Sequence, residues 1–215
     1  PLAWLGRGTL GLLSEIGRIS IFSGRTGLAA FSPPWNLTQL WKQIVAIGFY
    51  SLPVVGLSAV FIGAALALNI YTGGNRFGVE QFVPNIVVLG ITRELGATIT
   101  GLMLAGRVTA GIAAEIGAMK VTEQIDALKT LSANPFRYLY APRFLAAALT
   151  LPILVLVADI IGVMGGWLVR VYALDFDSTT YIRNTVDFLT MEDVSVGLIK
   201  AVIFGIIVSS ISCAA

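Results

Sequence analysis

The chain has 215 residues, of which 56% are hydrophobic and 12% are charged. Soluble domains carry about 25% charged residues, and a net charge of +2 is too small for a surface that neutralises nucleic-acid phosphates. The composition therefore predicts one membrane domain and excludes a nucleic-acid-binding one. The absence of His excludes an H-E-x-x-H zinc site and a Ser-His-Asp triad, and the single Cys213 excludes an internal disulfide.

The first segment, residues 1–32, is apolar apart from a few charges. At about 100° per residue, Arg7, Arg18 and Arg25 fall on one narrow face of a helix. A basic stripe on an otherwise apolar helix is typical of helices that lie in the membrane interface. We predict an interfacial helix here rather than a further span, ended by two consecutive prolines.

Four apolar segments follow, and they predict an all-α, polytopic transmembrane domain. A membrane-spanning helix needs about 20 apolar residues. The predicted spans are 44–71, 82–106, 144–169 and 201–215. Pro53 predicts a kink in the first span. The fourth span meets the end of the chain after 15 residues, so we expect it to be cut short.

The distribution of Lys and Arg predicts the sidedness. Nine of the fourteen Lys and Arg residues lie before residue 44 or between residues 106 and 144. Positively charged connections stay on the cytoplasmic side of a membrane. We therefore expect the N-terminus and the connection between the second and third spans to be cytoplasmic.

Three charged residues lie inside the predicted spans. An unpaired charge in the bilayer centre costs at least about 2.5–3.5 kcal/mol, so such residues need partners or water. Arg93 and Glu94 in the second span fit either a polar gate on a substrate path or interhelical ion pairs that fix packing. Asp159 in the third span is a lone carboxylate that is either protonated or bonded to a neighbouring hydroxyl.

Small residues recur at four-residue spacing inside the spans. Ala59, Gly63 and Ala67 form one such series, and Gly162 with Gly166 forms another. This spacing allows two helices to approach closely. We interpret it as helix packing within one chain.

The connection from residue 106 to residue 135 has the pattern of an amphipathic helix. Ile112, Ile116 and Met119 recur at three- and four-residue steps among charged residues, so we predict a cytoplasmic helix over 112–130. The pattern fits either a surface helix on the membrane or a docking helix for a cytoplasmic partner.

Several stretches of this region have a characteristic sequence. They read TRELG at 92–96, AGR at 105–107, AEIGAM at 114–119 and TEQIDAL at 122–128. VFIG at 60–63, Asn134-Pro135 and APRF at 141–144 complete the set. In this order, they closely resemble the MlaE (YrbE) permease family, over residues 40 to 213.

The resemblance implies the membrane subunit of an ABC-type transporter that moves phospholipid between the inner and outer membranes of diderm bacteria and so maintains outer-membrane lipid asymmetry. Such a subunit lies in the inner membrane as a homodimer, with two cytoplasmic ATPase subunits and a periplasmic MCE-domain lipid-binding protein. Family members also have one more span after the last one seen here.

The resemblance also implies two groups of site residues. The lipid cavity at the dimer interface would be lined by Val60, Ala64, Ala67, Leu68, Tyr71, Arg93 and Glu94. The coupling helix that docks the ATPase would use Glu115, Gly117, Met119, Lys120, Thr122, Glu123, Gln124, Asp126 and Leu128. The chain has no G-x-x-x-x-G-K-[ST] pattern, so ATP and Mg²⁺ are expected in the partner. We expect no enzymatic activity, cofactor, metal or catalytic residue in this chain.

Other classes of protein remain open from the residues alone. An ion- or proton-coupled secondary transporter would use Glu94 and Asp159 as carriers. A scaffold that only gathers partners is a further alternative. A membrane enzyme is disfavoured because no nucleophile is paired with a base.

Overall fold

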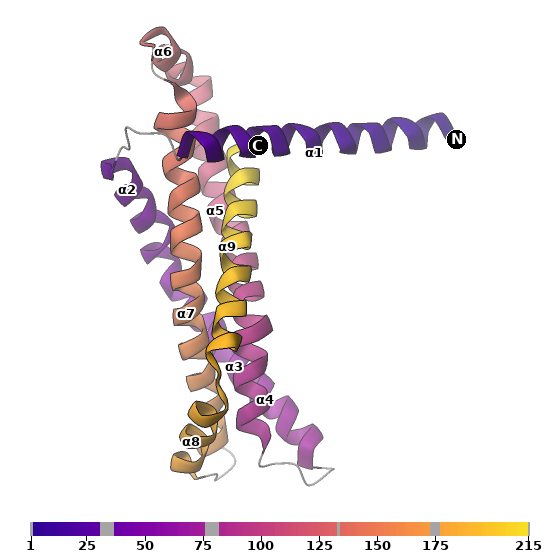
Figure 1. Ribbon diagram of the computed structural model, residues 1–215, viewed down its shortest axis with the longest axis vertical. Coiled ribbons are helices and arrows are strands. Elements are labelled where there is room, and N and C mark those ends of the chain that lie inside the picture. The colour runs from indigo at the N-terminus through magenta and orange to yellow at the C-terminus, as the bar shows by residue number, and fades with distance from the viewer. Residues whose placement is uncertain (1, 31–36, 76–81, 133, 173–176, 215) are drawn as a thin grey trace.

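The computed structural model describes residues 2–30, 37–75, 82–132, 134–172 and 177–214, and every regular element within these ranges is a helix. Four helical stretches are long and apolar enough to cross a membrane. They are Leu37–Gly74, Val83–Val121, Phe136–Tyr172 and Met191–Ala214. They run side by side in one elongated bundle (Figure 1). The predicted polytopic all-α fold is confirmed.

Most of these stretches consist of more than one element. The first contains α2 (Leu37–Ile47), the 3-10 turn η1 (Phe49–Ser51) and α3 (Leu52–Asn75). The second contains α4 (Val83–Leu89), the π-helical turn η3 (Gly90–Leu95) and α5 (Gly96–Val121). The third contains the π-helical turn η4 (Phe136–Tyr140) and α7 (Ala141–Tyr172), and the fourth is α9 (Met191–Ala214). Three further helices are α1 (Leu2–Ala30), α6 (Gln124–Thr130) and α8 (Ser178–Phe188).

The crossing helices extend beyond the boundaries predicted from the sequence. Helix α5 continues to Val121, past the predicted span end at residue 106, and α9 begins at Met191, before the predicted span start at residue 201. With 24 residues, α9 is long enough to cross a membrane. The sequence boundaries were set at charged residues, and the structure pairs several of these charges between helices. The pairs are Glu115–Arg143, Arg93–Asp193 and Glu94–Lys200.

The predicted helix over 112–130 is divided between two elements. Its first half is the end of α5, and its second half is α6. The break falls at Thr122 and Glu123, where Glu123 has a left-handed backbone with φ of 56°. Such a conformation cannot continue an α-helix, so the chain turns there.

The first crossing stretch is interrupted just before Pro53. Helix α2 ends at Ile47 and α3 begins at Leu52. Proline in the first turn of a helix lacks an N–H group that would otherwise bond the preceding turn, so the helix begins anew. Arg107 of α5 donates a hydrogen bond to Ser51 Oγ in this break (2.5 Å). The kink predicted at Pro53 is therefore a short 3-10 turn on its N-terminal side.

Helices α3 and α7 pack closely through glycine. A Cβ atom on Gly63 would collide with the carbonyl group of Gly162, and one on Gly165 would collide with the backbone of Val60. The small-residue spacing thus serves packing within the chain, as predicted.

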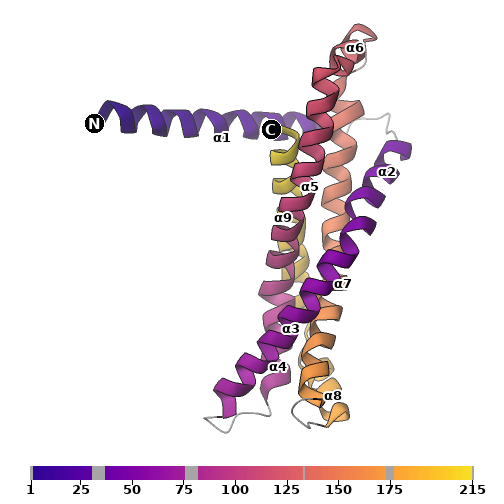
Figure 2. The same cartoon turned by 180° about the vertical axis from the view of Figure 1, so that it is seen from behind.

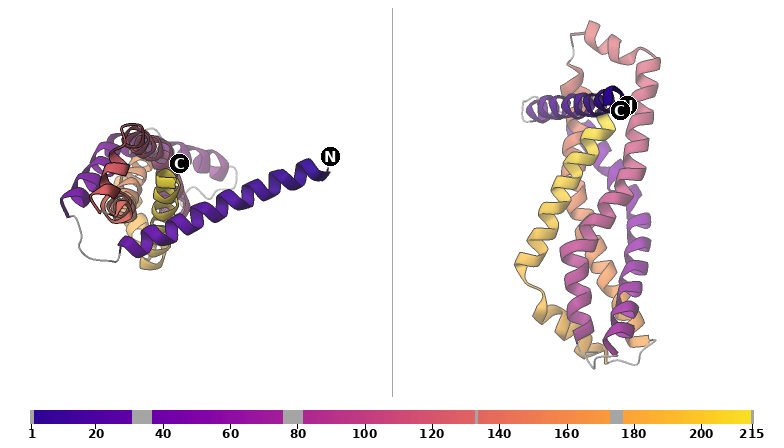
Figure 3. Two further views of the ribbon diagram at one scale, coloured as in Figure 1. Left: turned by 90° about the horizontal axis from the view of Figure 1, so that it is seen from above. Right: turned by 90° about the vertical axis from the view of Figure 1, so that its right-hand side faces the viewer.

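Helix α1 lies crosswise to the bundle, near one of its ends (Figures 1 and 2). Its C-terminal part is attached to the bundle, where Thr26 and Ala30 are buried and the Phe22 ring contacts Tyr140 edge to face at 5.0 Å. Its N-terminal part projects sideways (Figure 3). This is the geometry expected of an interfacial helix.

The two ends of the bundle carry different helices. Helices α1 and α6 lie at the same end as the C-terminus of α9, and α8 lies at the opposite end (Figure 1). The N-terminal region and the connection between the second and third crossing stretches therefore share one end of the molecule, as the charge distribution predicts.

Candidate functional site

The five α3 residues predicted to bind lipid do not share one face. Ala67 is fully buried in a cluster with Val83, Val87 and Ile91, so it packs on α4 and the adjacent π-helical turn inside the chain. Val60 and Ala64 are half-buried, and Val60 lies against Gly165 of α7.

The remaining two residues of this set have different surroundings. Leu68 is exposed. Tyr71 lies at the far end of α3, where the Arg170 guanidinium carbon sits 4.9 Å from the centre of its ring. Because Arg170 is 1% exposed, this contact belongs to the interior of the bundle.

The exposed face of α3 includes two large residues that the sequence analysis missed. Leu57 and Phe61 are exposed together with Leu68. Their spacing of four and seven residues places them on one side of a helix, and this periodicity was a signal in the sequence.

Next to this face is a cleft between α3 and α5. The volume that the centre of a water molecule can occupy in it is about 20 Å³, so in one chain the cleft is a shallow groove, far smaller than ligand pockets of about 300–1,000 Å³. Its walls are almost entirely apolar, with Ser58 and Thr100 as the polar exceptions. The apolar residues include Val55, Ile62, Ile91, Leu95, Ile99 and Met103. Such a cleft suits a hydrocarbon chain better than an ion.

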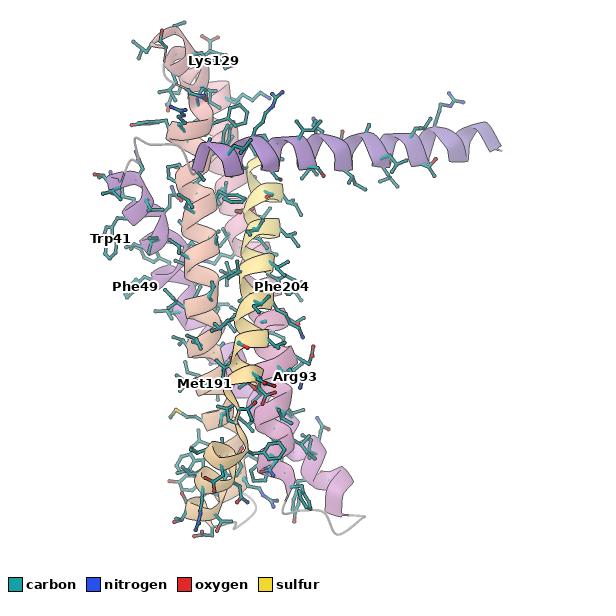
Figure 4. The ribbon with its side chains drawn as sticks, viewed as in Figure 1. Trp41, Phe49, Arg93, Lys129, Met191 and Phe204 are labelled. Atoms are coloured by element: carbon teal, nitrogen blue, oxygen red, sulfur yellow. The ribbon has the colours of Figure 1, made fainter. Side chains whose placement is uncertain are left out.

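Arg93 and Glu94 lie beside this cleft, on the π-helical turn, and both pair with α9. Arg93 Nη1 is 3.4 Å from Asp193 Oδ1, and Lys200 Nζ is 2.7 Å from Glu94 Oε2. Lys200 also donates to the Arg93 carbonyl oxygen at 2.9 Å. Ile91 and Leu95 of the same turn line the cleft. The turn thus presents an apolar side to the cleft and a charged side to α9. Figure 4 shows Arg93 near the start of α9, where Met191 is labelled.

Both charges form the interhelical ion pairs that the packing alternative expects. The pairs are not sealed, because the side chains of Arg93 and Glu94 are 55% and 64% exposed. π-Helical turns are rare and often occur at functional sites. The role of Arg93 and Glu94 as a gate stays a prediction. Both side chains are exposed enough to meet a ligand.

Asp159 of α7 is buried at the contact with α5. Its carboxylate lies against Gly96, where a Cβ atom would collide with Oδ1. Within the described part of the chain, Oδ1 has no hydrogen-bond partner. No neighbouring hydroxyl among these residues therefore satisfies that oxygen.

The predicted coupling residues lie at one end of the molecule, on what we call the α5–α6 tip, residues 117–132. The tip projects beyond α1 (Figure 1). Except for Met119 and Leu128, which are half-buried, all its predicted residues are exposed. These exposed residues are Gly117, Lys120, Thr122, Glu123, Gln124 and Asp126.

Two apolar residues of the tip were missed from the sequence. Val121 is 84% exposed and Leu131 is 78% exposed, although both are aliphatic. They flank α6 on both sides. Exposed aliphatic residues at a projecting tip are typical of a surface that a partner covers.

Glu115 is also exposed, at 49% of its side chain, but it lies before the tip and is paired with a buried residue. Its Oε2 atom is 2.8 Å from Nη2 of Arg143, whose side chain is 3% exposed. The structure therefore separates Glu115 from the other predicted coupling residues and joins it to the start of α7.

Comparison with known proteins identifies the family. The family described as Permease MlaE matches residues 40–215. A probable ABC transporter permease protein of Rickettsia bellii is 52% identical over 209 residues, which are 97% of this chain and 81% of that protein. The intermembrane phospholipid transport system permease protein MlaE of Haemophilus influenzae is 34% identical over 213 residues, which are 97% of this chain and 80% of that protein. Both the match of the family and these identities cover most of the sequence, and the chain belongs to the MlaE permease family.

Proposed function

We propose that this chain is the membrane-spanning subunit of an ABC-type phospholipid transporter. The observation that carries the proposal is the family membership over residues 40–215, joined to a Haemophilus influenzae relative named as an intermembrane phospholipid transport permease. The chain has no nucleotide-binding P-loop pattern, so a separate ATPase subunit hydrolyses ATP.

The cargo site is the apolar cleft between α3 and α5, completed by a second copy of the chain. One cleft alone, with about 20 Å³ for the centre of a water molecule, is too small to hold a lipid. A homodimer whose two clefts face each other encloses a larger apolar volume, with the exposed Leu57, Phe61 and Leu68 at the contact. Acyl chains fill this volume, and Arg93 attracts the phosphate of the headgroup.

The ATPase docks on the α5–α6 tip. The second crossing stretch has 39 residues, and at 1.5 Å per residue it is roughly 58 Å long, about twice the hydrocarbon thickness of a bilayer. The end of α5 therefore stands in water. A short helix with exposed aliphatic residues beside charged ones suits a groove on a partner.

This proposal implies an orientation in the membrane. The tip and α1 face the cytoplasm, α1 lies in the headgroup layer of the inner membrane, and the α8 end faces the periplasm. A periplasmic lipid-binding protein of the MCE class then receives or delivers lipid at the α8 end.

The proposed mechanism is mechanical. ATP binding closes the two ATPase subunits, which displace the two tips and rearrange the helices around the lipid. The Arg93–Asp193 and Glu94–Lys200 pairs are half-exposed, so a phosphate headgroup can exchange with a carboxylate for Arg93. The pairs thereby act as a polar gate beside an apolar cleft.

An ion-coupled secondary transporter is the alternative. It needs Glu94 and Asp159 as carriers, yet Glu94 is already paired with Lys200. Asp159 supports this alternative better, because its Oδ1 atom lacks a hydrogen-bond partner among the described residues. Lipid movement that depends on a proton gradient and not on nucleotide would favour it.

The proposed function is tested by purifying the full chain, expressed with its genomic neighbours, and identifying the proteins and lipids that remain bound. We expect an ATPase and phospholipid by mass spectrometry. Glu123→Lys should reduce the bound ATPase severalfold without affecting membrane insertion, because Glu123 is an exposed residue of the tip.

The matched control is Arg183→Glu, a charge reversal at an exposed position of α8 at the opposite end. It should leave the ATPase bound. Equal ATPase recovery from the two variants would contradict docking at the tip, and purification without ATPase or phospholipid would contradict the transporter.

A further inference from the structure

The Glu115–Arg143 ion pair joins two elements at the base of the α5–α6 tip. Glu115 lies on α5 just before the tip begins, and Arg143 lies in the first turn of α7 just after the chain returns from it. Their side chains meet at 2.8 Å. The ion pair therefore connects α5, which leads into the tip, to α7, which follows it, at the point where both helices join the bundle.

Glu115 compensates the buried positive charge of Arg143. The Arg143 side chain is 3% exposed, and its Nε and Nη1 atoms have no hydrogen-bond partner among the described residues. A buried charge whose partner is removed is strongly destabilising. Glu115, by contrast, is half-exposed and reaches inward to Arg143.

The pair lies near the end of the apolar contacts of α5. Val108 and Ile112 are buried in the main core and Ile116 packs against it, whereas a Cβ atom on Gly117 would meet no atom within 4 Å. The hydrophobic effect is non-directional. A charge-assisted hydrogen bond is directional, so it fixes the register at this level.

The two helices that the pair joins form different walls of the cleft. Helix α5 contributes Ile99 and Met103, and α7 contributes Gly162, which also contacts Gly63 of α3. A displacement of the tip that reaches both α5 and α7 therefore changes the cleft from two sides.

We propose that the Glu115–Arg143 pair is a brace that makes α5 and α7 move together when the tip is displaced. Glu115 is then a positioning residue inside the chain and not a contact to the ATPase. This inference rests on the proposed function for the source of the displacement, but the brace itself is a property of this chain alone.

The test uses the complex of the full chain with its co-expressed partners, in proteoliposomes that contain a fluorescent phospholipid. Glu115→Gln alone leaves Arg143 charged and should lower the melting temperature. The double variant Glu115→Gln with Arg143→Met removes the buried charge, so its melting temperature should recover, because apolar replacement of a buried ion pair is often neutral. We expect the double variant to keep its ATPase and to move at least about fivefold less lipid per ATP, the lower end of coupling between sites.

A second readout needs no partner. Spin labels on Lys129→Cys in α6 and Arg183→Cys in α8 report the distance between the tip and the far end, and Cys213 is buried away from the reagent. The double variant should broaden this distance distribution. The matched control pair is Glu15–Arg18 on α1, whose removal by Glu15→Gln in the unlabelled complex should not change lipid moved per ATP.

Three outcomes decide the matter. Normal lipid transfer per ATP in the double variant overturns the brace and leaves a purely structural pair. Loss of bound ATPase from Glu115→Gln at an unchanged melting temperature also overturns it, since Glu115 would then contact the partner. Absence of any ATPase from the wild-type complex contradicts the proposed function. In that case the spin-label distances still test the brace, and an unchanged distribution in the double variant overturns it.

Discussion

Asp177 caps the N-terminus of α8 at the end of the molecule away from the tip. Its Oδ2 atom accepts hydrogen bonds from the Thr180 amide at 2.8 Å and from the Thr180 hydroxyl at 2.7 Å. The hydrogen bond from the Thr180 side chain, followed by that from its backbone, lowers the pKa of Asp177 below its ordinary value of 3.8. The ionised carboxylate thus holds the first turn of α8.

The cap predicts a pH dependence for α8. A carboxyl whose pKa is lower in the folded than in the unfolded form stabilises the folded form above the unfolded pKa, and this stabilisation is lost as pH falls through the folded pKa. Hydrogen exchange at the Thr180 amide should therefore accelerate, relative to its intrinsic rate, as pH falls below 3.8. Asp177→Asn is the control, because Asn also caps helices but does not titrate, and an identical pH profile in both proteins would refute the assignment.

Individual charges were the residues least predictable from sequence. Arg143 and Lys200 were read as residues outside the spans, because a charge in a membrane is costly when unpaired. The structure pairs Arg143 with Glu115 and Lys200 with Glu94. These partners are 28 and 106 positions apart in the sequence, so no local pattern identifies them.

At the scale of elements, the contact between α3 and α7 depends on glycine. Gly63→Ala should force the two backbones apart and destabilise the protein by about 1–3 kcal/mol, as overpacking does in tight cores. Gly106→Ala is the matched control: its Cβ atom would meet no atom within 4 Å, and alanine favours the helix by about 1 kcal/mol. In thermal unfolding in detergent, Gly63→Ala should lower the melting temperature and Gly106→Ala should raise it. A Gly63→Ala protein as stable as the wild type would show that this contact is looser than described.

The sequence predicted the number and order of the crossing helices but not their bounds. Apolar length is a local property, so each span was detectable near its centre. The division of 112–130 depends on the left-handed backbone of Glu123, and Glu seldom adopts that conformation. Likewise, the helical period groups Ala67 with Tyr71, but only the tertiary structure reveals that α4 and Arg170 cover them.

At the scale of the whole molecule, the two ends should lie on opposite sides of the membrane. Lys129 and Arg183 are similarly exposed on α6 and α8, at 61% and 81% of the side chain. A membrane-impermeant maleimide added to intact spheroplasts should label Arg183→Cys and spare Lys129→Cys, and lysis should make both reactive. The native Cys213 is buried and provides the unlabelled background. The reverse pattern would place the tip outside the cell, beyond the reach of an ATPase.

The sideways projection of α1 also gives the molecule unequal cross-sections. Seen from above, the bundle is narrow and α1 extends well beyond it at one end only (Figure 3). With α1 in the headgroup layer, the protein occupies more area in that leaflet than in the other, and it has the shape of a wedge. A protein of this shape fills space in a leaflet whose headgroups are spread apart, as they are on the convex side of a curved membrane. The chain should therefore favour membrane regions that are convex on the side of α1.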